Sequence, residues 1–168
     1  RQVNRELYQE AAKNEEFSGM GTTLVAAATE GATLYVSNIG DSRLYLIRAG
    51  KAYQVTRDHS YVEEMVAAGR MERGSREYLS QKNIITRAAG MTERVEADFF
   101  EVDLEEGDHI LLCSDGLTNM VDDGTIARIA SGGECVRARA EKLVNQANEN
   151  GGRDNITVIL ADYEKEVG

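Results

Sequence analysis

Proline, tryptophan and cysteine are absent or scarce in this 168-residue sequence, which has no Pro, no Trp and two Cys. The two thiols, Cys113 and Cys135, cannot build the disulfide framework of a small secreted protein or a Cys/His zinc cluster. We expect both thiols to be buried and unreactive. Without proline, the turns depend on the 16 glycines, which therefore mark where strands and helices end.

Long apolar runs are missing as well. No stretch approaches the roughly 18 apolar residues that a membrane-spanning helix needs. The first residues also lack the apolar region of a signal peptide. We therefore expect no membrane partner, and a cytoplasmic location is the default.

Positive charge is in deficit, with 19 Lys and Arg against 29 Asp and Glu and a formal net charge of −10. This balance disfavours nucleic acid or an anionic membrane as a partner. Most of the carboxylates are expected on a solvated surface. The hydrophobic share of 42% is enough for one core, so the length fits a single domain.

Hydrophobic periodicity and the glycine positions predict a mixed α and β chain. Helices are expected at about 3–12, 61–68, 125–130 and 135–148, and strands at 22–30, 33–39, 43–47, 52–55, 95–102, 109–113 and 156–161. A capping box from Ser60 to Glu63 starts the second helix. Short glycine-marked turns between the first four strands favour an antiparallel meander, because parallel strands need longer crossovers.

Two of these strands and one long segment have further features. The strands 109–113 and 156–161 are apolar on both faces, which is typical of central strands. The segment from Gly69 to Gly90 is charged and weakly periodic, so we expect an irregular excursion. Excursions of this length within a compact domain tend to be functional.

Aspartates stand at the ends of several predicted strands. Asp115 follows the most hydrophobic strand, Asp154 precedes the last strand, and Asp41 lies in the turn between the strands 33–39 and 43–47. Such carboxylates can converge at one rim of a sheet and bind a hard divalent cation. Aspartate is also an ordinary turn residue. That second interpretation is favoured for Asp41 alone, and the two are balanced for Asp115 and Asp154.

Other constellations are weaker. The segment Gly19-Met20-Gly21 lacks the lysine of a phosphate-binding loop and precedes a strand. Ser114, His59 and Asp115 could be imagined as a catalytic triad, but the Gly-x-Ser-x-Gly elbow is missing and helix capping explains the neighbours of His59. Five basic residues between positions 70 and 87 could meet an anion, although scattered solvated charge is favoured.

Six short segments follow one another in an order that resembles the PPM family, the metal-dependent type 2C serine/threonine protein phosphatases. The resemblance is greatest to the short bacterial members and covers the chain from the first helix to Tyr163. Each segment is short, but six in order are specific. They are Gly19-Met20-Gly21-Thr22-Thr23, Asn38-Ile39-Gly40-Asp41-Ser42-Arg43, Asp58-His59-Ser60, Asn83-Ile84-Ile85-Thr86-Arg87-Ala88-Ala89-Gly90, Cys113-Ser114-Asp115-Gly116-Leu117 and Gly152-Arg153-Asp154-Asn155-Ile156-Thr157.

The resemblance implies an α+β fold, an αββα sandwich of two antiparallel sheets flanked by helices. It also implies hydrolysis of phosphoserine and phosphothreonine by a water that two Mg²⁺ or Mn²⁺ ions activate, with a third ion in bacterial members. Carried over by motif, Asp115 and Asp154 are catalytic ligands of the first metal. Asp41 joins Asp115 at the third metal, and Asn155 steadies the Asp154 turn. The stretch from Gly69 to about 81 matches the family's flap beside the active site.

The sequence departs from the family pattern at its start. That pattern begins with strands that carry a phosphate-binding arginine and an early Asp-Gly whose aspartate bridges both metals. The Asp-Gly pairs here, Asp115-Gly116 and Asp123-Gly124, come far later. We therefore expect a single domain that is incomplete at the amino terminus, with the substrate arginine upstream, little or no activity, and sheet edges open to association.

The expected partners are phosphoproteins, the substrates of a cognate Ser/Thr kinase. Another signalling phosphoprotein, such as an anti-sigma-factor antagonist, remains an alternative substrate. A catalytically dead PPM-like module that binds a partner is the alternative from a different class. Retention of Asp41, Asp115 and Asp154 argues against that module, because a relic has no reason to keep all three.

Overall fold

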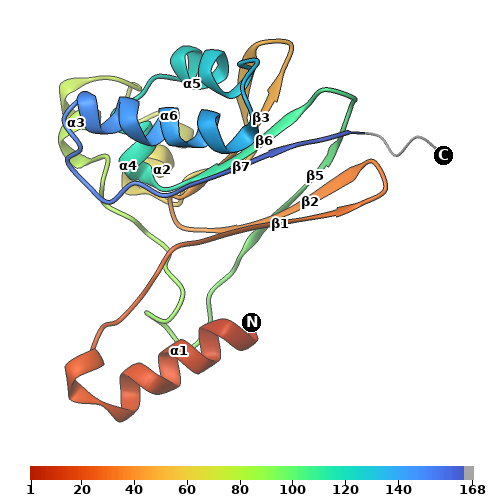
Figure 1. The fold of residues 1–168 in the computed structure, drawn as a ribbon. Helices are drawn as coiled ribbons and strands as arrows, with labels where there is room; N and C mark the ends of the chain where they lie inside the picture. Colours follow the sequence, from red (N-terminus) through yellow and green to blue (C-terminus); the bar gives the residue numbers. More distant parts are fainter. Residues whose placement is uncertain (165–168) are drawn as a thin grey trace. The chain divides into compact units, whose positions relative to one another are not determined.

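The computed structural model describes residues 1–164. The chain divides into two compact units, and each is described by itself (Figure 1). Unit 1 contains Arg1–Leu24, Asn38–Asp41 and Arg57–Asp98, and unit 2 contains Val25–Ser37, Ser42–Thr56 and the chain from Phe99 onward. A single domain therefore stays a prediction. Within residues 1–164, no helix combines the length and the apolar character that crossing a membrane requires.

Unit 2 contains an antiparallel four-stranded sheet with the strand order β4-β3-β6-β7. The strands are β3 (Arg43–Arg48), β4 (Lys51–Gln54), β6 (His109–Cys113) and β7 (Val158–Asp162). The register places Tyr45 opposite Leu111 and Leu111 opposite Leu160. Because these buried side chains lie on the same face of neighbouring strands, they form one side of a core.

Three helices cover that face of the four-stranded sheet (Figure 1). They are α4 (Asp115–Thr118), α5 (Asp123–Ala130) and α6 (Val136–Glu149). Each contributes a fully buried side chain, namely Leu117, Ile126 and Leu143 respectively. Burial of a side chain of this size contributes about 1.5–3 kcal/mol, so these contacts are a main source of stability in unit 2.

A three-stranded sheet faces the other side of the four-stranded sheet, with the strand order β1-β2-β5. Its strands are β1 (Leu24–Glu30), β2 (Thr33–Ile39) and β5 (Asp98–Asp103). Leu34 and Val36 of β2 pack with Leu44 and Leu46 of β3 in a second core. Side chains alternate along β3, so Tyr45 faces the helices while its neighbours face the other sheet. The predicted layers of an α+β sandwich are confirmed.

Unit 1 contains the remaining helical elements of the described chain and few buried apolar side chains. Its helical elements are α1 (Gln2–Lys13), the 3₁₀ turn η1 (Glu15–Phe17), α2 (Tyr61–Ala67) and α3 (Arg76–Gln81). The buried Asn4 ties α1 to a distant loop, since its side chain accepts from Gly90 N–H at 2.8 Å and donates to the carbonyls of Thr92 and Glu93. Polar contacts therefore hold much of this unit together.

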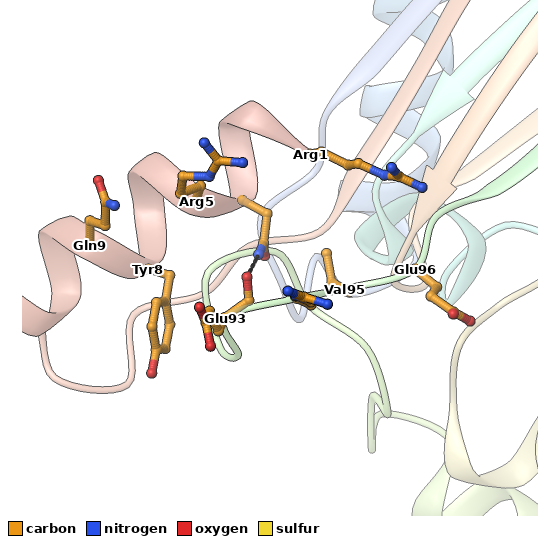
Figure 2. A pocket seen from close by; sticks show the side chains of 9 residues that line it. Arg1, Arg5, Tyr8, Gln9, Glu93, Val95 and Glu96 are labelled. Atoms are coloured by element: carbon orange, nitrogen blue, oxygen red, sulfur yellow. Dashed lines mark hydrogen bonds between the residues drawn. The ribbon is translucent and has the colours of Figure 1, made fainter.

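A polar pocket of about 760 Å³ lies between α1 and the loop 93–96 in unit 1 (Figure 2). Its lining carries three arginines and two glutamates, and it is formed by Arg1, Asn4, Arg5, Tyr8, Gln9, Glu93, Arg94, Val95 and Glu96. None of the predicted metal ligands lines this pocket. It is therefore not the candidate site.

The predicted meander is wrong, although its four strands are confirmed. β2 and β3 lie in different sheets. The connection between them does not fold back as a hairpin, because Gly40 has a φ of +102° and its carbonyl accepts from His59 N–H. The chain therefore leaves one sheet at this turn and enters the other.

Four smaller expectations also need correction. In the described residues, β7 is an outer strand of its sheet and not a central one, and its Ile159 is 58% exposed. The helix α3 was not expected inside the excursion, nor was the single turn α4. Cys113 is buried as predicted, but Cys135 is exposed.

Candidate metal centre

Asp115 and Asp154 lie near the same end of the β6–β7 pair. The two strands are antiparallel, and Cys113, the last residue of β6, stands opposite Val158, the first residue of β7. Asp115 comes two residues after Cys113, and Asp154 comes four residues before Val158. The sequence therefore delivers both aspartates to one rim of the sheet, as the strand-end argument predicted.

A hydroxyl group joins the two segments that carry these aspartates. Ser114 Oγ donates to the Asn155 carbonyl at 3.0 Å and accepts from Thr157 N–H at 3.0 Å. The Ser114 N–H also donates to the Thr157 carbonyl at 3.1 Å. These three bonds, which we call the Ser114 clamp, extend the β6–β7 pairing beyond the strand ends. They hold the segments of Asp115 and Asp154 beside each other.

Close backbone packing at Gly116 reinforces this clamp. A Cβ atom at position 116 would lie 2.3 Å from the Asn155 carbonyl oxygen and 2.9 Å from its carbon. Only glycine therefore fits between the start of α4 and the segment of Asp154 without a shift of backbone.

The two carboxylates differ in their surroundings. Asp115 is half-buried at the first position of α4, and its Oδ2 accepts from Asn119 Nδ2 at 3.0 Å, one turn further along the helix. Asp154 is exposed, and its Oδ1 accepts from Asn155 N–H at 2.7 Å. Asn155 thus contacts both Asp154 and Ser114 through its backbone. Its predicted role in steadying the Asp154 turn stays a prediction.

Asp41 belongs to unit 1, while Asp115 and Asp154 belong to unit 2. It is half-buried and follows Gly40 in the segment Asn38–Asp41, which we call the Asp41 turn. Across residues 1–164, no group of three or more His, Cys, Asp or Glu side chains could hold a metal ion. The structure thus brings together the segments of two predicted ligands and describes the third in the other unit.

The donor chemistry of Asp115 and Asp154 fits a hard divalent cation. Both offer carboxylate oxygens, which Mg²⁺ and Mn²⁺ prefer to nitrogen and sulfur. They come from the ends of two paired strands, which is a rigid support. Mg²⁺ usually takes one or two protein carboxylates and keeps several waters, so two ligands from this unit are compatible with it.

The imagined Ser/His/Asp triad is not formed. The hydroxyl of Ser114 is engaged with the backbone of Asn155 and Thr157. The ring of His59 instead contacts Gly40 N–H and Asp98. Each of these side chains therefore has a structural contact in place of a triad partner.

Two of the five basic residues between positions 70 and 87 are held by carboxylates. Arg73 forms an ion pair with the buried Glu63 of α2, and Tyr78 OH donates to Glu63 Oε1 at 2.7 Å. These contacts fix the middle of the excursion and were not visible in the sequence.

Arg87 pairs with Asp98 at 3.0 Å. Burial raises the pKa of Asp98, but hydrogen bonds from His59 and Arg87 outweigh it, so this pKa lies below its usual value.

A comparison with family models identifies the chain. The model described as Protein phosphatase 2C matches residues 1–161. The chain belongs to this family. Bacterial members are among its relatives, as the resemblance indicated.

The serine/threonine phosphatase stp of Listeria innocua is 39% identical over 161 residues, which are 96% of this chain and 64% of the relative. The protein phosphatase PhpP of Streptococcus pneumoniae is 42% identical over 164 residues, which are 97% of this chain and 66% of the relative.

Solved structures of serine/threonine phosphatases agree with this fold. The serine/threonine phosphatase Stp1 from Staphylococcus aureus matches with a TM-score of 0.92 and 37% identity, over 97% of this chain and 64% of that one. The catalytic domain of the phosphatase PstP, in complex with two manganese ions, matches with a TM-score of 0.85 and 36% identity, over 96% of this chain and 67% of that one. The chain thus spans slightly less than two thirds of the curated relatives' length.

Proposed function

We propose that this chain is part of a metal-dependent serine/threonine protein phosphatase, in which Asp115 and Asp154 are ligands of Mg²⁺ or Mn²⁺. The observation that carries the proposal is the Ser114 clamp, which holds the segments of both aspartates at one rim of the sheet. Membership of the protein phosphatase 2C family and the manganese ions of PstP support it. The substrates are phosphoserine and phosphothreonine in proteins, those of a cognate kinase in the cytoplasm.

The cations, when bound, supply an activated water and neutralise charge on the phosphoryl group. The residues of this chain provide the rigid frame. Asn119 orients the Asp115 carboxylate through its 3.0 Å hydrogen bond. The Asn155 N–H orients Asp154, and Ser114 keeps the two segments together. Asp41, in the other unit, is proposed as a ligand of a further ion.

Little or no turnover is expected from residues 1–168 alone. The sequence has no early Asp-Gly that could bridge two ions and no recognised phosphate-binding arginine. In the described part of the chain, each sheet also has two outer strands, β1 and β5 in one and β4 and β7 in the other, and such edges favour association.

The test is Mn²⁺-dependent hydrolysis of p-nitrophenyl phosphate by this chain and by a chain extended at its amino terminus to the length of the relatives. We expect activity in the extended chain, with a loss of at least about 100-fold in Asp115→Asn and Asp154→Asn, because each removes a charged metal ligand. Asp122→Asn is the matched control. Asp122 caps α5 by accepting from Thr125 N–H, and asparagine caps a helix equally well.

The outcomes separate the candidates. Normal turnover in both ligand variants would show that the site is assigned to the wrong residues. Equal and robust activity of the short and extended chains would refute the expected dependence on further residues. Failure of the extended chain to bind Mn²⁺ in a calorimetric titration would instead favour a partner-binding module.

A further inference from the structure

His59 is a buried side chain of unit 1 that contacts several segments of that unit. It is only 4% exposed. The backbone N–H of His59 donates to the Gly40 carbonyl at 2.9 Å, and its ring Nδ1 accepts from the Gly40 N–H at 3.1 Å. One residue therefore makes two hydrogen bonds to the residue that directly precedes Asp41.

The contact with Gly40 N–H indicates which nitrogen of the neutral ring carries the proton. An Nδ1 that accepts from a backbone N–H has no proton of its own, so the proton of the neutral ring is on Nε2. Nε2 lies 3.2 Å from Asp98 Oδ2, to which it can donate. Arg87 Nη1 holds the other oxygen of Asp98 at 3.0 Å. Asp98 and Arg87 thus fix the ring, and the ring fixes the Asp41 turn.

The Asp41 turn needs such support because its backbone is unusual. Gly40 has a φ of +102°, a conformation that favours glycine, and a Cβ there would lie 2.4 Å from Thr23 Cγ2. The fully buried Asn38 binds the Gly40 carbonyl at 3.3 Å and the Arg57 carbonyl at 3.0 Å. Hydrogen bonds with both Asn38 and His59 therefore restrict the backbone that leads into Asp41.

We propose that His59 is a positioning residue for Asp41, acting through the hydrogen bond from Gly40 N–H to Nδ1. The inference rests on the proposed function, in which Asp41 is a metal ligand. His59 also joins this turn to the end of the excursion, because its carbonyl accepts from Thr86 N–H at 2.8 Å.

Two substitutions separate the two ring nitrogens. In His59→Asn, the amide oxygen can take the place of Nδ1 and still accept from Gly40 N–H, while the link to Asp98 is lost. In His59→Gln, the amide nitrogen can take the place of Nε2 and still donate to Asp98, while the acceptor for Gly40 is lost. A purely structural role predicts similar behaviour of the two variants, whereas the positioning role predicts different behaviour.

The experiment measures the Mn²⁺ affinity of the extended chain by calorimetry, for the wild type, both His59 variants and Asp41→Asn, with a melting curve for each. Loss of a residue that orients a metal ligand weakens metal binding by about 10–100-fold. We expect the affinity of His59→Gln for the most weakly bound Mn²⁺ to be about tenfold lower than that of the wild type. The affinity of His59→Asn should stay within about threefold of the wild-type value. Equal affinities of His59→Gln and the wild type, with weakened binding in Asp41→Asn, would overturn the inference.

Unchanged binding in Asp41→Asn would instead overturn the role of Asp41 in the proposed function, and the positioning role with it. Nitrogen-15 NMR of the wild-type histidines supplies a readout that needs no variant. His59 should show an unprotonated Nδ1 and a protonated Nε2. The opposite tautomer would refute the hydrogen bond on which the inference depends.

Discussion

Replacement of Gly116 by alanine tests the close packing between α4 and the segment that carries Asp154. The new Cβ would lie 2.3 Å from the Asn155 carbonyl oxygen, so the two backbones must separate by about 1 Å to reach ordinary contact. Overpacking of this kind costs about 1–3 kcal/mol. The separation also breaks the bond from Ser114 Oγ to Asn155, for about 1 kcal/mol more.

Alanine offsets part of this cost, because it is about 1 kcal/mol better than glycine within a helix. The free energy of unfolding should therefore fall by about 2 kcal/mol. Gly133→Ala is the matched control, since a Cβ at this position would meet no atom within 4 Å. It should change stability by less than about 0.5 kcal/mol in the destabilising direction.

Urea unfolding followed by circular dichroism measures both variants against the wild type, with the slope m checked for constancy. The Mn²⁺ affinity of the extended chain supplies a second readout, because the substitution moves the segments of Asp115 and Asp154 apart. Equal stability of Gly116→Ala and the control would refute the packing argument. Lower stability with unchanged Mn²⁺ binding would refute its connection to the metal site.

Three further predictions concern other contacts. Ser60→Ala removes the cap of α2, and the urea midpoint should correspond to a loss of about 1 kcal/mol. Glu63→Gln removes the charge that holds Arg73, so trypsin should cleave the excursion several times faster, as gel electrophoresis can follow. The hydrogen bond from Arg48 lowers the pKa of Asp108 below 3.8. Its folded pKa is depressed, so its contribution is present above about pH 4 and is lost as the pH falls through the folded pKa. In Asp108→Asn, the free energy of unfolding from urea titrations should therefore fall less steeply as the pH is lowered below about 4.

Each of these predictions has a contrasting result. Ser60→Thr should retain most of the cap, and equal losses in the threonine and alanine variants would contradict the capping argument. Glu64→Gln, on the exposed side of α2, should leave proteolysis unchanged; cleavage as fast as in Glu63→Gln would show that the ion pair does not hold the excursion. If the free energy of unfolding falls as steeply at acid pH in Asp108→Asn as in the wild type, other groups cause the acid sensitivity.

Local patterns in the sequence predicted the strands and the longer helices. Glycine spacing located β2, and a continuous apolar run located β6, with their observed bounds. Both patterns depend on side chains that are close in the chain. The partners of the strands could not be derived in this way. The turn at Gly40 looks like a hairpin, yet contacts with His59, nineteen positions away, direct the chain into another sheet.

The candidate site shows the same division between local and distant information. Asp115 and Asp154 could be proposed from their positions beside apolar strands. The contribution of Ser114 could not, since its partners lie more than forty positions away. Similarly, the burial of His59 depends on segments from Gly40 to Asp98, and its neighbour Ser60 suggested only a helix cap.

The hydroxyl of Ser114 also restricts which amino acids can occupy that position. One oxygen atom must donate to the Asn155 carbonyl and accept from the Thr157 N–H at the same time. Alanine and valine can do neither, and the longer, weaker thiol of cysteine does both poorly. Serine and threonine are the two side chains that place a hydroxyl there. Functional variants should therefore have serine or threonine at position 114. Any other amino acid there indicates that the ends of β6 and β7 have separated.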